Sequence, residues 1–221
     1  SKMQKNSKNP SEDLAYKFRD QVYIFVIPLI ANGIKSQLNK KSLTTEELQG
    51  IYQMAMKVFF KLLFVAYAEE KGLLPHRSNV YYRENSLKNI AENMLELWNS
   101  GHEFGPGFKL WNKTQAIFNA IENGNPDWDI PAYSGGLFSI DQGESSILSP
   151  LEKIKLPDKH YGRILQYLLL VRGDDGEQGL VDFRSLVIGE FGTIYEGLLE
   201  SELSIAETNL VLENKGKNKD S

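Results

Sequence analysis

Residues 44–75 read TTEELQGIYQMAMKVFFKLLFVAYAEEKGLLP, and this stretch predicts one long helix. Thr44 stands three residues before Glu47, which is the spacing of a capping box, where the two residues exchange side-chain and backbone hydrogen bonds. Gly72 can take the left-handed conformation that ends a helix, and Pro75 prevents an immediate restart. At about 1.5 Å per residue, such a helix is roughly 40 Å long.

From Val58 to Ala68 this stretch is apolar except for Lys61. A helix that is apolar nearly all round is one that other helices surround, which predicts that Phe64 is buried. The run is shorter than the roughly 20 apolar residues that a membrane span needs, and Lys57 interrupts it further. We therefore predict the central helix of a soluble core and no membrane partner.

The same helix ends on two acids, Glu69 and Glu70, at the end where the helix dipole disfavours negative charge. Either these acids are solvated, or they pair with basic groups on a neighbouring element. Because charge runs usually face water, we expect a solvated end.

The composition bounds the class of protein. A chain of 221 residues is one large domain or two small ones and can bury a core without covalent links. It has no Cys, which excludes disulfides, thiolate zinc sites and a Cys nucleophile, and which suits a cytoplasmic location. Its first ten residues are polar and do not resemble a signal peptide. His76, His102 and His160 are isolated in the sequence and predict no metal site.

The charge is distributed unevenly along the chain. Six Lys and one acid lie in 1–11 and 214–221, so that 12–213 contains 19 basic and 28 acidic residues, a net charge of −9. A self-sufficient nucleic-acid-binding domain usually carries a basic footprint, which this core has only if its basic residues cluster on one face. We interpret 1–11 as a disordered leader, 12–213 as one helical domain and 214–221 as a Lys-rich tail.

The fold class predicted is mainly α: an irregular multi-helix bundle around the central helix 44–71, with a long packed loop and at most a few short strands. The first helix carries an apolar face at Leu14, Phe18, Val22, Phe25 and Leu29, with Pro28 inside it. The other predicted elements are helices over 12–38, 84–100, 110–122, 158–172 and 185–203, the packed loop 123–150, and strands over 180–183 and 210–212.

The segment HRSNVYYREN, residues 76–85, is predicted to be a loop that mixes basic and aromatic side chains. Arg77, Tyr81, Tyr82 and Arg83 have the composition seen where proteins contact nucleic acid. The alternative is a loop that packs on the core through its tyrosines, which we favour because the cluster is small.

Two further stretches imitate nucleotide or methyltransferase motifs. The sequence Asn-Pro-Asp-Trp at 125–128 is close to the Asn-Pro-Pro-aromatic loop of amino-group DNA methyltransferases, but it follows a helix and not a buried strand, so we interpret it as a turn. Gly135 and Gly136 could offer backbone N–H groups to a phosphate. No Lys follows them in the P-loop position, so we interpret them as a turn anchored by Tyr133 and Phe138.

A Glu-x-Lys pattern at Glu213 and Lys215 has the form of the restriction-nuclease metal site. There an upstream acid and the Glu hold Mg²⁺, and the Lys assists the attacking water. The upstream acid would be Asp182 or Asp158. A stand-alone Mg²⁺-dependent nuclease is therefore the alternative function, although a site at the start of a frayed tail lacks rigid support.

Four stretches together resemble a known family: 61–75, 130–138, the helix that starts at Asp158, and 181–203 with its specific Ile-Tyr-Glu-Gly-Leu-Leu-Glu run. In order and spacing they resemble the segment before the methyltransferase domain in bacterial type IIG enzymes, which fuse nuclease, helical connector and adenine methyltransferase in one chain. Related phage-defence methyltransferases are similar. The residues that carry the resemblance are Glu69, Gly72, Pro75, Tyr133, Gly135, Gly136, Phe138, Tyr195, Glu196 and Gly197.

The resemblance implies a non-catalytic connector that positions catalytic and DNA-recognition modules on DNA. In the family the cofactor loop and the catalytic Asn-Pro-Pro-Tyr lie downstream, so no catalytic residue is carried over. S-adenosylmethionine, and Mg²⁺ where a nuclease is present, are expected for the parent and not for this segment. The expected partners are a downstream methyltransferase domain, an upstream nuclease domain and DNA. The candidate DNA contacts are Arg77, Arg83, Lys88 and Arg163.

The stretch 189–202 predicts an amphipathic helix with Phe191 and Tyr195 on its apolar face. We expect it to pack on the central helix near residues 62–67 and to fix the direction in which the chain continues. Gly192 and Gly197 would permit the close approach, because neither has a side chain.

Overall fold

The long helix predicted from the sequence is α3, Thr45–Glu70, in a computed structural model of the chain. Its start has the predicted capping box. Thr44 Oγ1 accepts a hydrogen bond from the Glu47 N–H group, and the Glu47 carboxylate accepts one from the Thr44 N–H group. Its end is followed by Gly72, whose φ of 71° lies in the left-handed region that glycine favours. Both helix ends were therefore predicted correctly.

The structure describes residues 22–38, 40–133, 137, 154–172, 178–187, 189–192, 201–206 and 209–214. The fold is mainly α, and the described strands form two separate antiparallel hairpins, β1–β2 and β3–β4. Besides α3, the elements are α2 (Tyr23–Gln37), α4 (Val80–Asn85), α5 (Leu87–Asn99), α6 (Lys109–Asn123), the 3-10 turn η2 (Pro126–Trp128), α7 (Asp158–Leu169), β1 (Leu170–Arg172), β2 (Gln178–Leu180), the 3-10 turn η4 (Phe183–Ser185), β3 (Ser201–Ala206) and β4 (Asn209–Asn214).

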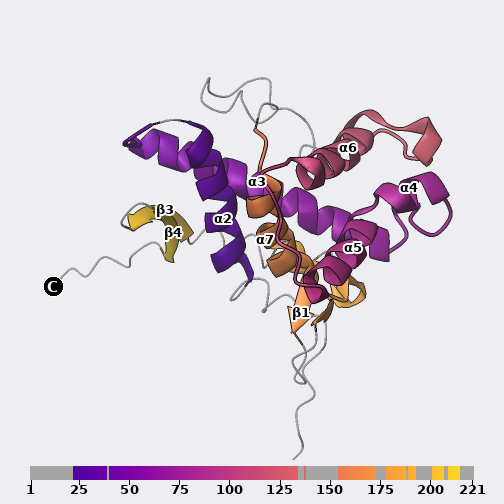
Figure 1. The fold of residues 1–221 in the computed structure, drawn as a ribbon. Helices are drawn as coiled ribbons and strands as arrows, with labels where there is room; N and C mark the ends of the chain where they lie inside the picture. Colours follow the sequence, from indigo (N-terminus) through magenta and orange to yellow (C-terminus); the bar gives the residue numbers. More distant parts are fainter. Residues whose placement is uncertain are drawn as a thin grey trace, which may run out of the picture.

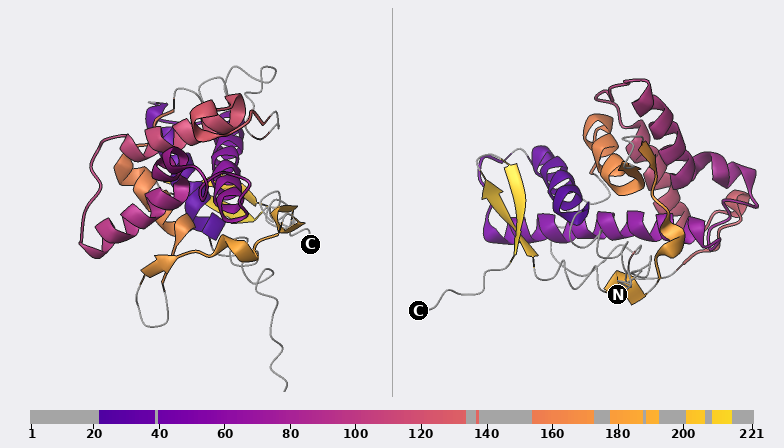
Figure 2. Two further views of the ribbon diagram at one scale, coloured as in Figure 1. Left: turned by 90° about the vertical axis from the view of Figure 1, so that its right-hand side faces the viewer. Right: turned by 90° about the horizontal axis from the view of Figure 1, so that it is seen from below.

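Helix α3 packs on elements from different parts of the chain. It contacts α2, α5, β3 and η4, and α7 packs in turn on α2, α5 and α6 (Figure 1). The right panel of Figure 2 shows α3 along its length, with the β3–β4 hairpin near its start and α4 near its end. Among the described helices, α3 is long and apolar enough to span a membrane, yet 72% of its apolar window is buried inside the fold. It is therefore the core helix of a globular domain.

The predicted burial of Phe64 is wrong, because α3 is not equally buried all round. Phe64 is half-buried, and it shares this property with Lys57, Phe60 and Lys61. These positions follow a spacing of three and four residues, so they form one stripe along the helix. The two lysines mark the stripe in the sequence. Phe59, on the opposite side, is 0% exposed.

Helix α2 differs from its prediction in which face it buries. Phe25 was assigned to the apolar face but is 50% exposed, and its ring stacks on Tyr167 of α7 with centroids 5.3 Å apart. Val22 is buried as predicted and Leu29 is half-buried against the core, but the other buried side chains are Val26, Ile27, Ile30, Ala31 and Ile34. Both α3 and α7 pack on α2, so its buried face is wider than one apolar row and rotated from the predicted one. Leu14 and Phe18 lie outside the described residues.

The predicted loop 76–85 contains a short helix, α4, and the predicted helix 84–100 begins only at Leu87. Each start has a side-chain cap that explains the boundary. Asn79 Oδ1 accepts from the Tyr82 N–H group, and Ser86 Oγ accepts from the Asn89 N–H group. Helix α5 then ends before Gly101, and α6 before Gly124, as predicted.

The C-terminal third corrects three predicted boundaries. The predicted helix 158–172 ends at Leu169, and β1 follows it directly. The predicted strand 180–183 lies at 178–180, with η4 after it. The predicted helix 185–203 is helical at 189–192, but Ser201–Leu203 belong to β3, and 193–200 lie outside the described residues. The predicted strand 210–212 is confirmed within β4.

One side chain fixes the β3–β4 hairpin to the helices. Asn32 Nδ2 donates to the Leu210 carbonyl oxygen at 3.0 Å, and the Leu210 N–H group donates to Asn32 Oδ1 at 2.8 Å. The carboxamide thus binds both backbone groups of Leu210, which pairs with Ile205 of β3 and whose side chain is 1% exposed. The direction of β4 is therefore set relative to α2.

Candidate functional site

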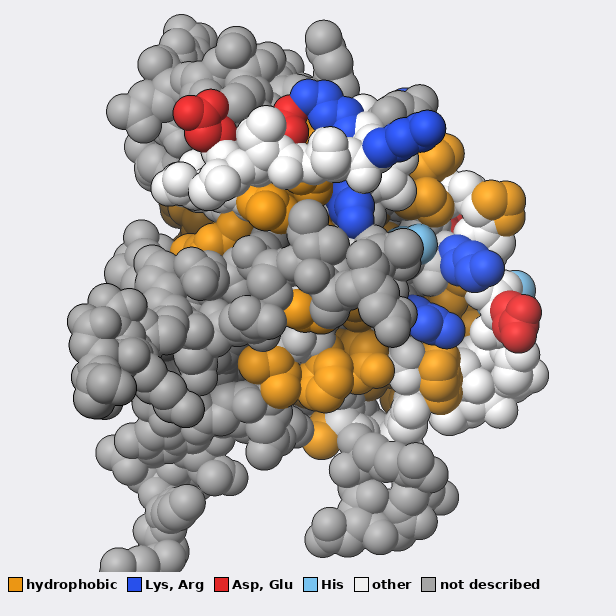
Figure 3. Space-filling model, turned by 90° about the vertical axis from the view of Figure 1, so that its left-hand side faces the viewer, with side chains coloured by type: hydrophobic (Ala, Val, Ile, Leu, Met, Phe, Trp, Pro, Cys, Tyr) orange, Lys and Arg blue, Asp and Glu red, His pale blue; other side chains and the backbone are white. Residues whose placement is uncertain are grey.

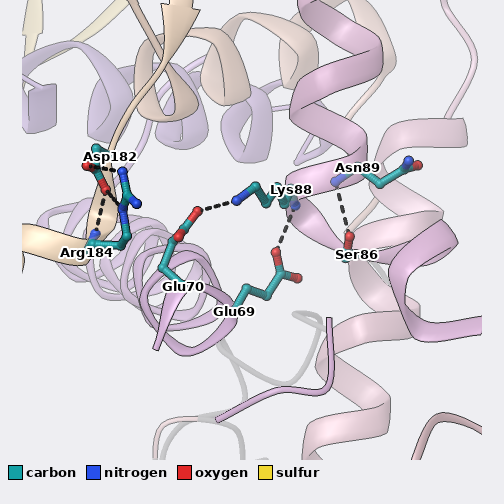
Figure 4. A network of polar contacts seen from close by, with 7 residues as sticks. All are labelled: Glu69, Glu70, Ser86, Lys88, Asn89, Asp182 and Arg184. Atoms are coloured by element: carbon teal, nitrogen blue, oxygen red, sulfur yellow. Dashed lines mark hydrogen bonds and ion pairs between the residues drawn. The ribbon is translucent and has the colours of Figure 1, made fainter. Parts of the chain in front are cut away.

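The polar centre of the fold is Glu69, a carboxylate that is only 3% exposed at the end of α3. Its Oε1 accepts hydrogen bonds from the Tyr82 hydroxyl at 2.6 Å and from the Leu87 N–H group at 2.8 Å. Its Oε2 accepts one from the Lys88 N–H group at 2.8 Å. Glu69 therefore joins α3, α4 and α5, and Figure 4 shows it reaching the first turn of α5.

The expectation that Glu69 is solvated is wrong, and the helix geometry explains why. The C-terminus of α3 disfavours an acid, but the N-terminus of α5 has unpaired N–H groups and the positive end of a helix dipole. Burial raises the pKa of Glu69 to about 7, against the opposing effect of its three hydrogen bonds. Burial and the neighbouring charge of Glu69 also raise the pKa of Tyr82.

Two ion pairs flank this carboxylate. Lys88 Nζ lies 2.7 Å from the Glu70 carboxylate, so Glu70 is paired across α3 and α5 and not simply solvated as expected. Asp182 and Arg184 form a second pair at 2.8 Å on η4, and hydrogen bonding to Arg184 lowers the pKa of Asp182 (Figure 4). Lys71 Nζ donates to the Arg184 carbonyl oxygen at 2.8 Å, which ties η4 to the end of α3.

A cavity of about 30 Å³ lies beside these groups, lined by side chains of α3, α5, the end of α7, β2 and η4. This volume holds about one water molecule and no substrate. Glu69 has the raised pKa that general acids and bases often have, but its carboxylate is engaged with groups of its own fold and the cavity that it lines is too small for a reactant. The arrangement is chemically suited to fixing the angles between three helices.

The four candidate DNA contacts do not form one patch. Arg77 and Arg83 are exposed and adjacent, since the Arg83 guanidinium donates to the Arg77 carbonyl oxygen at 2.7 Å. Lys88 is engaged with Glu70. Arg163 is exposed on α7. Figure 3 draws the side of the molecule opposite α4, and the Lys and Arg side chains on that side lie among apolar, acidic and uncharged ones.

The two adjacent tyrosines of the Arg77–Arg83 segment differ in burial, and each fits one of the two interpretations of that segment. Tyr82 is buried against Trp128, with ring centroids 5.7 Å apart, as the packed interpretation requires. Tyr81 is exposed to solvent, as the nucleic-acid interpretation requires. A helix explains the difference, because consecutive residues of a helix point about 100° apart.

The residues of the family resemblance are only partly described. Gly72 ends α3 and Pro75 follows it, while Tyr133 lies beside the same corner, its hydroxyl donating to the Leu73 carbonyl oxygen at 3.4 Å. Outside the described residues lie Gly135, Gly136, Phe138, Tyr195, Glu196 and Gly197.

The predicted contact between 189–202 and the central helix is confirmed at its described end. The Phe191 ring lies edge to face on Tyr67 of α3, with centroids 5.3 Å apart. The predicted close approach at Gly192 is wrong, since no described atom lies within 4 Å of where its Cβ would stand. The contact at this end is therefore made by ring packing and not by a glycine.

The two upstream acids considered for a nuclease site have other partners in the described structure. The Asp158 carboxylate accepts from the Lys109 and Leu110 N–H groups at 3.0 and 2.8 Å, and so caps α6. Asp182 is paired with Arg184. Glu213 lies in β4, and Lys215 lies outside the described residues. No three His, Asp or Glu residues of the described chain gather as metal ligands.

Sequence reasoning missed the role of three residues that join distant segments, although it had named Glu69 and Asp158 for other reasons. Asn32, Glu69 and Asp158 each satisfy backbone groups more than ten residues away. The roles of Glu69 and Asp158 could have been considered from the sequence, because the first N–H groups of α5 and α6 need hydrogen-bond acceptors. Nothing in the sequence indicates the role of Asn32, because an Asn inside an apolar helix is simply an isolated polar residue.

Searches against protein-family models, curated proteins and solved structures find no match to this chain.

Proposed function

We propose that this chain is a non-catalytic helical connector of a bacterial DNA-modifying enzyme of the type IIG kind, which holds an adenine methyltransferase domain at a fixed distance and angle from other modules on DNA. The resemblance of four stretches to the segment before such a domain supports the proposal. The parent would act in the cytoplasm with S-adenosylmethionine, and with Mg²⁺ if it also has a nuclease domain. Its partners would be those domains and DNA.

The observation that carries the proposal is the pair of hydrogen bonds between Asn32 and Leu210. A two-stranded hairpin is marginal by itself and would point in variable directions. Here β4 is fixed to α2, and α2 is packed along α3. A connector needs this fixed orientation of β4, because the orientation of a domain that follows β4 is then set by the helices.

Asn32→Leu is expected to slow adenine methylation by the parent protein about tenfold or more, since small misplacements of a reacting group have effects of this size. The variant leaves both backbone groups of Leu210 without their partner. The affinity for S-adenosylmethionine should not change, because the cofactor would bind in the downstream domain. Methylation is measured with tritiated cofactor, and cofactor affinity by calorimetry.

Gln37 provides a matched control for this experiment. Its carboxamide makes the same pair of bonds, to the Lys155 carbonyl oxygen at 2.9 Å and from the Lys155 N–H group at 3.2 Å, but it does not hold the hairpin. Gln37→Leu should therefore retain methylation. Equal losses in the two variants would mean that general destabilisation, and not orientation, explains the effect.

The alternative function, a Mg²⁺-dependent nuclease, has one observation in its favour: Glu213 lies on a strand, as the Glu-x-Lys pattern requires. The connector proposal makes the opposite prediction for the chain itself. We expect the 221-residue chain to bind neither S-adenosylmethionine nor Mg²⁺ with micromolar affinity in calorimetry. Micromolar Mg²⁺ binding together with DNA cleavage that Glu213→Ala abolishes would replace the connector by the nuclease.

A further inference from the structure

Helix α4 presents one aromatic ring to solvent between two arginines. Tyr81 is 65% exposed, although the Tyr next to it is buried. Arg77 and Arg83 are both exposed on either side of it in the sequence. Val80 adds an exposed apolar side chain. We call these four residues, Arg77, Val80, Tyr81 and Arg83, the α4 surface.

The α4 surface is held in place by contacts on its inner side. The Arg83 guanidinium donates to the carbonyl oxygens of His76 and Arg77, at 2.9 and 2.7 Å, which closes the turn before α4. Asn79 Nδ2 donates to the Asp129 carboxylate at 2.7 Å and to the Asp127 carbonyl oxygen at 3.0 Å. The exposed ring of Tyr81 is therefore presented by a rigid support, and little conformational entropy is lost when a ligand binds to it.

The charge of this segment contrasts with the rest of the chain. Residues 71–88 contain four basic residues and one acid, Glu84, whereas 12–213 as a whole has a net charge of −9. Two of the four basic groups face the fold, since Lys71 donates to a carbonyl oxygen of η4 and Lys88 pairs with Glu70. The Arg77 side chain and the Nη1 group of Arg83 remain for an external anion, since Arg83 uses Nε and Nη2 for its two carbonyl bonds, and charge complementarity points to a polyanion as the partner.

We infer that the α4 surface binds single-stranded DNA, with an unpaired base stacked on Tyr81 and the flanking phosphates on Arg77 and Arg83. An exposed aromatic ring beside basic side chains is the arrangement by which proteins hold unpaired bases. The inference rests on the proposed function, because an enzyme that takes a base out of the duplex works on locally unpaired DNA. It adds to that function a second role for the connector, which is to hold the strand.

The test is fluorescence anisotropy of the 221-residue chain with labelled dT20 at several salt concentrations. Tyr81→Ala is expected to weaken binding about tenfold, the effect of losing one stacked base. Arg77→Ala is expected to reduce the slope of log affinity against log salt by about one phosphate contact. The matched controls are Tyr167→Ala, an exposed Tyr on α7, and Lys41→Ala, an exposed cation before the start of α3, and both should bind as the wild type does.

Four results would overturn the inference. The first is no measurable binding of dT20 at low salt. The second is an equal loss in the α4 variants and the controls. The third is a duplex that binds as tightly as dT20 and whose binding is insensitive to Tyr81→Ala. The fourth is a wild-type chain that sediments as a dimer and a Tyr81→Ala variant that sediments as a monomer with unchanged dT20 binding, which would make this surface a contact between copies. The Asn32→Leu experiment tests the connector separately, so a failure of the proposed function and a failure of this inference can be told apart.

Discussion

Replacing Phe59 by alanine is expected to lower the free energy of unfolding by about 3–5 kcal/mol, the usual effect of removing a buried Phe side chain. Phe59 is 0% exposed in the middle of α3, and its ring packs edge to face on Phe60. Several helices meet around α3, so the surrounding side chains cannot collapse easily into the space that the ring leaves. Urea denaturation followed by circular dichroism measures the change.

Phe64→Ala is the matched control, because it removes the same ring from the half-buried stripe of the same helix. Its loss of stability should be no more than about 2 kcal/mol, within the range of ordinary substitutions. If Phe64→Ala lowers the free energy of unfolding as much as Phe59→Ala does, the assignment of Phe64 to the half-buried stripe is contradicted.

The second large effect concerns Glu69 and depends on pH. The folded-state pKa of Glu69 is about 7, above its ordinary value of 4.5. The folded chain therefore binds this proton more tightly than the unfolded chain does, and the free energy of unfolding should fall as pH rises from about 4.5 to 7. The contribution of this one group is about 3 kcal/mol, since each unit of pKa corresponds to about 1.4 kcal/mol. Above pH 7 the contribution is constant.

Glu69→Gln should remove this dependence, because its amide does not titrate. The variant also loses an acceptor for the Lys88 N–H group, so its stability is lower by about 1–3 kcal/mol where Glu69 is protonated. The informative quantity is therefore the difference between wild type and variant as a function of pH, from urea titrations between pH 4.5 and 8. Glu70→Gln, one residue further on, should keep the wild-type slope. A wild-type minus Glu69→Gln difference that is constant over this range would show that Glu69 does not titrate near neutrality.

Much of the helical framework could be predicted from the sequence, because its signals are local. The capping box at Thr44, and the glycines that follow α3, α5 and α6, each act within a few residues of the boundary that they set. The exposed face of α2 could not be predicted in this way. Which side chains α2 buries depends on its tertiary contacts with α3 and with α7, which is more than 100 residues away in the sequence. Phe25 is exposed because its partner is a single exposed ring, Tyr167.

The candidate site was harder to predict than the fold for the same reason. The sequence around Glu69 shows two acids in an unfavourable last turn, and water is the default partner for such groups. Glu69 is buried and not solvated because of the position of α5, whose first N–H groups lie within hydrogen-bonding distance of the carboxylate. The segment 76–85 was correctly recognised as basic and aromatic, but only the helical phase of α4 decides that Tyr82 turns inward and Tyr81 outward.

The hydrogen bonds between Asn32 and Leu210 affect the order in which the parts of the chain fold during synthesis. The two residues are separated by 178 positions, so α2 leaves the ribosome long before its partner strand exists. At about 5–20 residues per second, the interval is roughly ten to forty seconds. During that time the carboxamide of Asn32 has to stay hydrated beside apolar neighbours. Closing this contact is therefore among the last steps of folding, and a nascent chain that lacks β4 should contain its helices before it has a fixed exit direction.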